Sequence, residues 1–188
     1  QQATLRLANG MEMTSVRRGA WKMLEQAVLE EDGGSFADYE PLCYLEARAT
    51  NTECWVWRYE PGRRLIVAFR GTSDFGDVLT DIATIPRDFG ALGKVHEGFL
   101  RAYESIREAL MAALYAGFGG DGGAGWEVLF TGHSLGGALA TLASFDAARR
   151  SAAVVDRRIG EEEDDVALRD APRIDAEVAA CTFGAPRV

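Results

Sequence analysis

The sequence has no excess of positive charge and no long apolar segment. Its 20 Lys and Arg residues are outnumbered by 29 Asp and Glu residues, which gives a net charge of −9 over 188 residues. Because proteins bind nucleic acid through clustered cations, this balance disfavours a nucleic-acid partner, and it equally disfavours electrostatic contact with anionic lipid. No apolar run approaches the roughly 20 residues that cross a bilayer, so the sequence predicts no transmembrane segment.

Cysteine is also scarce, with three residues at Cys43, Cys54 and Cys181. Their spacing matches neither a disulfide framework nor a CxxC metal pattern. Cys43 and Cys54 flank a short segment, so they could pair in an oxidising compartment or remain buried free thiols. The cysteines therefore leave the compartment of the protein open.

Motifs for bound groups are lacking as well. The glycine-rich stretch 117–125 does not end in the Lys-Ser/Thr pair of a phosphate-binding loop. The acidic run 161–165 could hold a metal ion, but no ligand pattern accompanies it, and a solvated surface stretch explains it better. We therefore expect no cofactor and no metal.

What the sequence contains is the composition of a globular domain, with 47% hydrophobic and 26% charged residues. Its patterns predict a helix over 14–31, a hairpin of strands 53–59 and 64–70, a long loop over 71–93, a helix over 98–116, a strand over 126–131, a helix over 136–150 and a strand over 178–183. The alternation after residue 60 indicates a parallel sheet with helices on its faces. We interpret 1–188 as a single domain, with a helical or extended lead-in over 1–50 and an acidic surface insertion over 151–177.

One motif carries chemistry. The strand that ends at Thr131 runs into Gly132-His133-Ser134-Leu135-Gly136, and a helix follows. This is G-x-S-x-G in the strand–turn–helix setting of a nucleophile elbow. The serine would stand on a strained turn, and the helix N-terminus would favour negative charge near its Oγ. The simpler interpretation is a tight turn with a capping serine.

The segment 131–140, Thr-Gly-His-Ser-Leu-Gly-Gly-Ala-Leu-Ala, resembles the nucleophile elbow of the class 3, or fungal-type, lipases. Other segments resemble this family in the same order. They are 68–72, 77–81 without the usual tryptophan, 95–99 followed by Ala102 and Tyr103, and 182–188. The resemblance covers about residues 64–188.

The resemblance implies an α/β-hydrolase fold, with a mostly parallel sheet, helices on both faces and an incomplete C-terminal part. It implies hydrolysis of acylglycerols or other lipid esters through an acyl-enzyme on Ser134, with Thr72 and the Leu135 backbone N–H as oxyanion donors. It also implies a lid over 73–93 and a lipid ester partner, met at a lipid–water interface. The apolar residues of this lid would be Phe75, Val78, Leu79, Ile82, Ile85 and Phe89.

A serine hydrolase also needs a base, and in this fold the order is serine, acid, histidine. No histidine follows Ser134, and the two in the sequence are His96 and His133. On so sharp a turn His133 would point away from its neighbour Ser134, and His96 is expected to pack or cap near a helix start. In the family, the acid and the histidine follow the segment that resembles 182–188. We therefore expect the chain to be the N-terminal part of a lipase domain.

This missing base keeps a second interpretation open, a catalytically inactive lipase-like module that binds lipid or protein. An acyltransferase would use the same elbow and differ only in whether water or another alcohol accepts the acyl group. A serine peptidase is disfavoured by the lipase-like surroundings of the motif. The oligomeric state and the acyl-chain preference cannot be inferred from the sequence.

Overall fold

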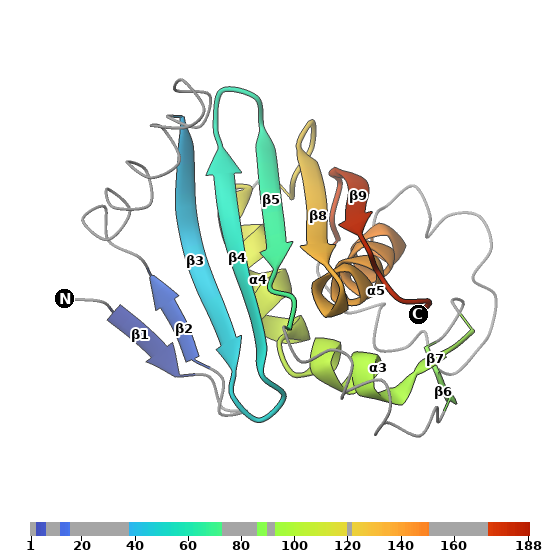
Figure 1. Cartoon of the computed structure of the whole chain (residues 1–188). Coiled ribbons are helices and arrows are strands. Elements are labelled where there is room, and N and C mark those ends of the chain that lie inside the picture. Colours follow the sequence, from blue (N-terminus) through green and yellow to red (C-terminus); the bar gives the residue numbers. More distant parts are fainter. Residues whose placement is uncertain are drawn as a thin grey trace.

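In the computed structural model, the described residues are 3–6, 12–15, 38–72, 86–89, 93–119, 122–150 and 173–188. They form a seven-stranded sheet, a two-stranded ribbon and helices that pack beside the sheet (Figure 1). The strands are β1 (Ala3–Arg6), β2 (Glu12–Ser15), β3 (Tyr39–Ala47), β4 (Thr52–Tyr59), β5 (Arg64–Phe69), β6 (Pro86–Asp88), β7 (Lys94–His96), β8 (Glu127–His133) and β9 (Glu177–Phe183). The helices are α3 (Glu97–Glu104), α4 (Arg107–Gly117) and α5 (Leu135–Arg149).

The large sheet is mixed, in the order β1-β2-β3-β4-β5-β8-β9. Neighbours from β1 to β5 are antiparallel, whereas β5, β8 and β9 run parallel. The predicted parallel arrangement is therefore found around the elbow, and the predicted hairpin, β4 and β5, joins it to an antiparallel half. β3 is absent from the expectations above, because the irregularity between Pro41 and Cys43 obscures the alternation of buried residues.

The helix predicted over 98–116 is broken into α3 and α4. Ser105 ends α3, and its hydroxyl donates to the Ala102 carbonyl over 2.6 Å. The same hydroxyl lies 2.7 Å from the Thr50 hydroxyl, in the turn after β3. Because serine hydroxyls compete with the helical backbone for hydrogen bonds, and this one has a tertiary partner, the prediction of one continuous helix was wrong.

The helices α4 and α5 lie against one face of the sheet (Figure 1). β5 and β8 bury every second residue toward this face, including Val67 and Phe130, which are fully buried. Ile66 and Ala68 alternate with the buried residues of β5 and point to the opposite face, where they are only half-buried. The second face of this strand is therefore less covered than its nearly continuous apolar sequence indicates. None of the described helices is both long and apolar enough to cross a membrane.

Two of the three cysteines lie in the core. Cys43 on β3 and Cys54 on β4 are buried free thiols, and they sit opposite Val56 and Leu45 rather than each other. Burial raises the pKa of the Cys43 thiol to about 12. Cys181 on β9 is exposed and also free. The interpretation as buried free thiols is confirmed for Cys43 and Cys54.

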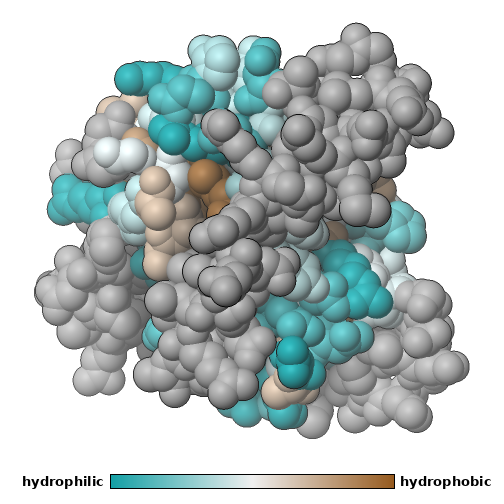
Figure 2. Space-filling view, turned by 90° about the vertical axis from the view of Figure 1, so that its left-hand side faces the viewer, coloured by the Kyte–Doolittle hydropathy of each residue, from teal (hydrophilic) through white to brown (hydrophobic). Residues whose placement is uncertain are grey.

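Several predicted features lie outside the described residues. The helix predicted over 14–31 overlaps them only at positions 14 and 15, which belong to β2. The acidic run 161–165 and most of the predicted lid also lie outside them. Figure 2 views the molecule from the β1 side of Figure 1, where the described residues are mainly hydrophilic with a small hydrophobic group among them.

Candidate active site

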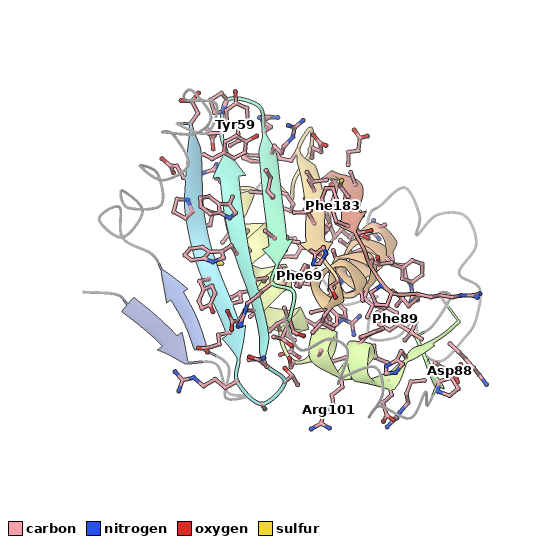
Figure 3. The ribbon with its side chains drawn as sticks, viewed as in Figure 1. Tyr59, Phe69, Asp88, Phe89, Arg101 and Phe183 are labelled. Atoms are coloured by element: carbon pink, nitrogen blue, oxygen red, sulfur yellow. The ribbon has the colours of Figure 1, made fainter. Side chains whose placement is uncertain are left out.

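Ser134 stands between the end of β8 and the first turn of α5. Because β5, β8 and β9 are parallel, their carboxyl ends meet at one edge of the sheet. Phe69 and Phe183, the last residues of β5 and β9, pair with the final residues of β8 and flank this point (Figure 3). Segments far apart in the sequence therefore surround the predicted nucleophile.

The backbone of Ser134 is strained. Its φ of 56° and ψ of −122° are unusual for a residue with a side chain. The turn is held by its own hydrogen bonds: the Ser134 N–H donates to the Phe183 carbonyl over 2.9 Å, and the Ser134 carbonyl accepts from the N–H groups of Gly137 and Ala138 over 2.9 and 3.2 Å. Ser134 is 7% exposed, so its hydroxyl is sheltered. The strained turn expected of an elbow is present.

Two glycines allow the chain to make this turn. A Cβ at Gly132 would lie 2.3 Å from the carbonyl of Gly136. A Cβ at Gly136 would in turn lie 2.5 Å from the carbonyl oxygen of Phe69, at the end of β5. Real Cβ atoms do not approach so closely, so strand, helix and the neighbouring strand end meet in this way only because both residues are glycine.

The predicted oxyanion donors belong to the two segments that meet here, the start of α5 and the chain that follows β5. Leu135 is the first residue of α5, so its N–H has no partner within the helix. Gly71 approaches the elbow so closely that a Cβ on it would lie 2.6 Å from the His133 carbonyl oxygen. Thr72 follows Gly71, and its hydroxyl is buried without a hydrogen-bond partner among the described residues. Such an orphan is rare in folded proteins and requires an explanation.

The sequence also matches a known protein family. Residues 66–188 match the family described as Lipase (class 3). The chain belongs to the class 3 lipase family. A lipase from Rhizomucor miehei is 31% identical over 102 residues, which make up 53% of this chain and 28% of that protein. The chain thus matches less than a third of the length of this curated relative.

Solved lipase structures share the fold. Lipase II from Rhizopus niveus superposes with a TM-score of 0.61 at 22% identity, covering 93% of this chain and 66% of that one. A triacylglycerol lipase whose catalytic centre is formed by a serine protease triad superposes with a TM-score of 0.51 at 22% identity, covering 71% of this chain and 57% of that one. The α/β-hydrolase fold implied by the resemblance is therefore confirmed.

Neither histidine of this class 3 lipase chain is arranged as a base for Ser134. His96 caps α3, because its Nδ1 accepts the Gly98 N–H over 3.1 Å, and its ring lies 4.6 Å from that of Phe99. The expected capping role of His96 is confirmed. His133 is exposed at the end of β8, and its ring lies beside Gly71 and Gly184.

Part of the predicted lid segment is described. Phe89 is 8% exposed, and its ring packs 6.1 Å from the rings of both Tyr103 and Phe145. Arg87 forms an ion pair with Glu97 at 2.8 Å, which ties β6 to α3. The end of this lipase segment is therefore fixed to α3 and α5, and the remainder of the lid stays a prediction.

A polar group that the sequence analysis missed supports the turn before Thr72. Glu53 on β4 binds Arg70, the residue after β5, and accepts the Tyr44 hydroxyl over 2.6 Å. Burial, and then the hydrogen bond to Glu53, raise the pKa of Tyr44 above its ordinary value, so the hydroxyl stays protonated and donates. Seventeen positions separate Glu53 from Arg70. The predicted hairpin of 53–59 and 64–70 places these two residues opposite each other, but their ion pair and the Tyr44 hydroxyl were not among the expectations.

Proposed function

We propose that this protein is a serine ester hydrolase that acts on acylglycerols or other lipid esters through an acyl-enzyme on Ser134. The observation that carries the proposal is the strained Ser134 at the start of α5, together with the Thr72 hydroxyl, which is buried and has no hydrogen-bond partner among the described residues. Membership of the class 3 lipase family supports the same substrate class. We propose that the substrate is met at a lipid–water interface, in keeping with the apolar residues of 73–93.

The reaction would start with attack of Ser134 Oγ on the ester carbonyl carbon. The carbonyl oxygen would become an oxyanion, accepting hydrogen bonds from the Leu135 N–H and the Thr72 hydroxyl. The N-terminus of α5 would add a favourable electrostatic field. Collapse of this intermediate would break the ester C–O bond and leave the acyl group on Ser134, while the proton removed from Ser134 passes to the leaving oxygen and the alcohol departs. Water would then attack the acyl carbon and release the carboxylic acid, and Ser134 Oγ would regain a proton. These steps use no metal and no cofactor.

The attack also needs a base that takes the hydroxyl proton of Ser134. His96 and His133 are not assigned to this role, because His96 caps α3 and His133 is the exposed last residue of β8. In the similar triacylglycerol lipase structure this function belongs to a serine protease triad. We propose the same class of base for the full-length protein.

The test is the substitution Ser134→Ala in the full-length protein, with turnover of a short p-nitrophenyl ester as the measurement. Loss of the nucleophile is expected to lower kcat on the order of 10⁶-fold, with the thermal midpoint little changed. Ser144→Ala is the matched control, because Ser144 lies on the same helix and donates only to the Thr141 carbonyl. Unchanged turnover in Ser134→Ala would refute the assignment. If the unmodified protein shows no turnover, the inactive lipid- or protein-binding module becomes the better proposal.

A further inference from the structure

We propose that Glu53 and Arg70 are positioning residues for the turn 70–72, called here the oxyanion turn, and hold Thr72 where the reaction needs its hydroxyl. Tyr44 completes this support by fixing the Glu53 carboxylate. The inference rests on the proposed function, in which Thr72 stabilises the oxyanion formed on attack by Ser134. It adds residues from β3 and β4, which lie outside the segments that resemble the lipase family.

Arg70 is bound to Glu53 in two ways. Its backbone N–H donates to the Glu53 carbonyl oxygen over 3.0 Å, and its guanidinium Nη1 forms an ion pair with Glu53 Oε1. A residue tied through both main chain and side chain has little freedom to shift or rotate. Because Gly71 and Thr72 follow directly, the turn begins from a fixed point.

The Glu53 carboxylate is itself fixed. Its Oε1 faces Arg70, and its Oε2 accepts the Tyr44 hydroxyl over 2.6 Å, so each oxygen has its own donor. The Glu53 side chain is only 18% exposed, whereas the Arg70 side chain is 55% exposed. Glu53 is therefore the more deeply buried partner, and it anchors the exposed Arg70 side chain to the sheet.

The other side of the turn is fixed by the elbow. Gly71 lies so close to the His133 carbonyl that a side chain on Gly71 would clash with it. The turn is thus held between β4 on one side and β8 on the other. Thr72 has no hydrogen-bond partner of its own among the described residues, so its position depends on these neighbours. Preorganised donors stabilise an oxyanion only when such a supporting shell holds them in place.

The opposite end of β5 provides a matched comparison. Arg64 opens this strand and pairs with Glu127 at 2.6 Å, with side-chain exposures of 42% and 32%. Both pairs join an arginine at an end of β5 to a glutamate on a neighbouring strand. Only the Arg70 pair lies next to the oxyanion turn. Glu127→Gln therefore removes an ion pair of the same strand without touching the site.

The experiment is a double-mutant cycle in the full-length protein, with Glu53→Gln, Thr72→Val and the combination. With a short p-nitrophenyl ester we expect Thr72→Val to lower kcat by ~10²–10³-fold. We expect Glu53→Gln to lower kcat about tenfold with little change in KM, less than the ~100-fold that a misplacement of 1 Å can cost. In the Thr72→Val background, Glu53→Gln should add no further loss, because the group that it positions is already gone. Glu127→Gln should leave both constants unchanged.

The outcomes separate the two proposals. Suppose that Thr72→Val lowers kcat by the expected ~10²–10³-fold. If Glu53→Gln then leaves kcat unchanged, or lowers it by the same factor in the unmodified protein and in Thr72→Val, the positioning role is overturned and the proposed function stands. If Thr72→Val loses less than about threefold, the oxyanion assignment itself fails, and the positioning role fails with it. Should Glu53→Gln not fold, Tyr44→Phe takes its place in the cycle. Tyr44→Phe keeps the ion pair and removes the donor to one Glu53 carboxylate oxygen. We expect it to lower kcat less than Glu53→Gln does, and to cause no further loss of kcat in the Thr72→Val background. An additive loss, or none, would overturn the inference.

Discussion

At the scale of single residues, the site depends on one backbone conformation. Ser134 has a φ of 56°, which glycine adopts freely and which costs a residue with a side chain ~1–3 kcal/mol. The strain persists because the Ser134 N–H and carbonyl are both held by hydrogen bonds. The strained turn therefore costs stability and is maintained by the surrounding hydrogen bonds.

This strain can be measured by comparing two variants. Ser134→Gly should have a free energy of unfolding about 1 kcal/mol higher than that of Ser134→Ala, because glycine relieves the strain while alanine keeps it. Urea denaturation of both variants measures the difference, provided that their unfolding free energies depend on urea concentration with the same slope. A less stable glycine variant would show that the elbow is not strained, since elsewhere replacement of alanine by glycine costs ~0.5–1 kcal/mol.

At the scale of elements, a buried carboxylate holds the helices together behind the site. Asp146 on α5 is 1% exposed. It accepts the Tyr103 hydroxyl from α3 over 2.6 Å, and its two oxygens each accept from the Arg107 guanidinium over 2.7 Å. Arg150 lies 3.6 Å away on the following turn. Asp146 therefore joins α5 to a residue on each side of the break, Tyr103 on α3 and Arg107 on α4.

The protonation of Asp146 follows from these contacts. Burial by itself would raise the pKa of this carboxyl, but the hydrogen bonds from Arg107 and Tyr103 and the nearby cations outweigh it and lower the pKa below its ordinary value. The unfolded chain therefore binds a proton at a higher pH than the folded protein. The stability contributed by Asp146 is complete above its unfolded pKa of about 4 and is lost as the pH falls through the folded pKa.

We therefore predict that Asp146→Asn destabilises the protein by ~3–5 kcal/mol at pH 7, because Arg107 is left without its buried partner. The variant should also lose part of the acid dependence of stability below pH ~4. Urea unfolding at pH 7 and pH 3 measures both effects. Asp88→Asn, at an exposed position of β6 (Figure 3), is the control and should stay within about 0.5 kcal/mol of the unmodified protein. Equal losses in the two variants would contradict the role of Asp146.

At the scale of the whole molecule, the described sheet ends on β9, which pairs with β8 on one side. Most of its residues are exposed, and Phe183 is 59% exposed. An unpaired parallel strand with an apolar surface is a template for association with another chain. The net charge of −9 opposes such association but does not remove the edge.

We predict that residues 1–188, expressed alone, associate as their concentration rises. We also predict that they hydrolyse esters only weakly, because among the described residues no base is hydrogen-bonded to Ser134. Sedimentation velocity across a concentration series measures the first expectation, and ester turnover measures the second. Thr182→Lys, at an exposed position of β9, should shift the distribution toward monomer, because a charge on an edge strand opposes pairing. A monomer that turns over at lipase-like rates would contradict both expectations, and His96→Ala would then identify the base.

Predictability from the sequence varied from one part of the chain to another. The hairpin β4–β5, the order of elements after it and the helix after the elbow are predicted because their apolar periodicity and turn residues are local signals. β3 and the break at Ser105 are not, because one depends on an irregular register and the other on a hydroxyl contact with Thr50. The predicted hairpin already places Glu53 opposite Arg70, whereas the Tyr44 hydroxyl that binds Glu53 comes from β3, the strand that is not predicted.

The sequence by itself determined the family, the elbow motif and the identity of the predicted nucleophile, because G-x-S-x-G between a strand and a helix is a short contiguous pattern. Tertiary structure decided what lies around it: the burial of the Thr72 hydroxyl without a hydrogen-bond partner among the described residues, the ion pair of Glu53 with Arg70, and the buried cluster at Asp146. The physical reason is the separation along the sequence of the residues that make each contact. A turn is specified by neighbouring residues, whereas burial, strand register and helix packing join residues that the chain holds far apart.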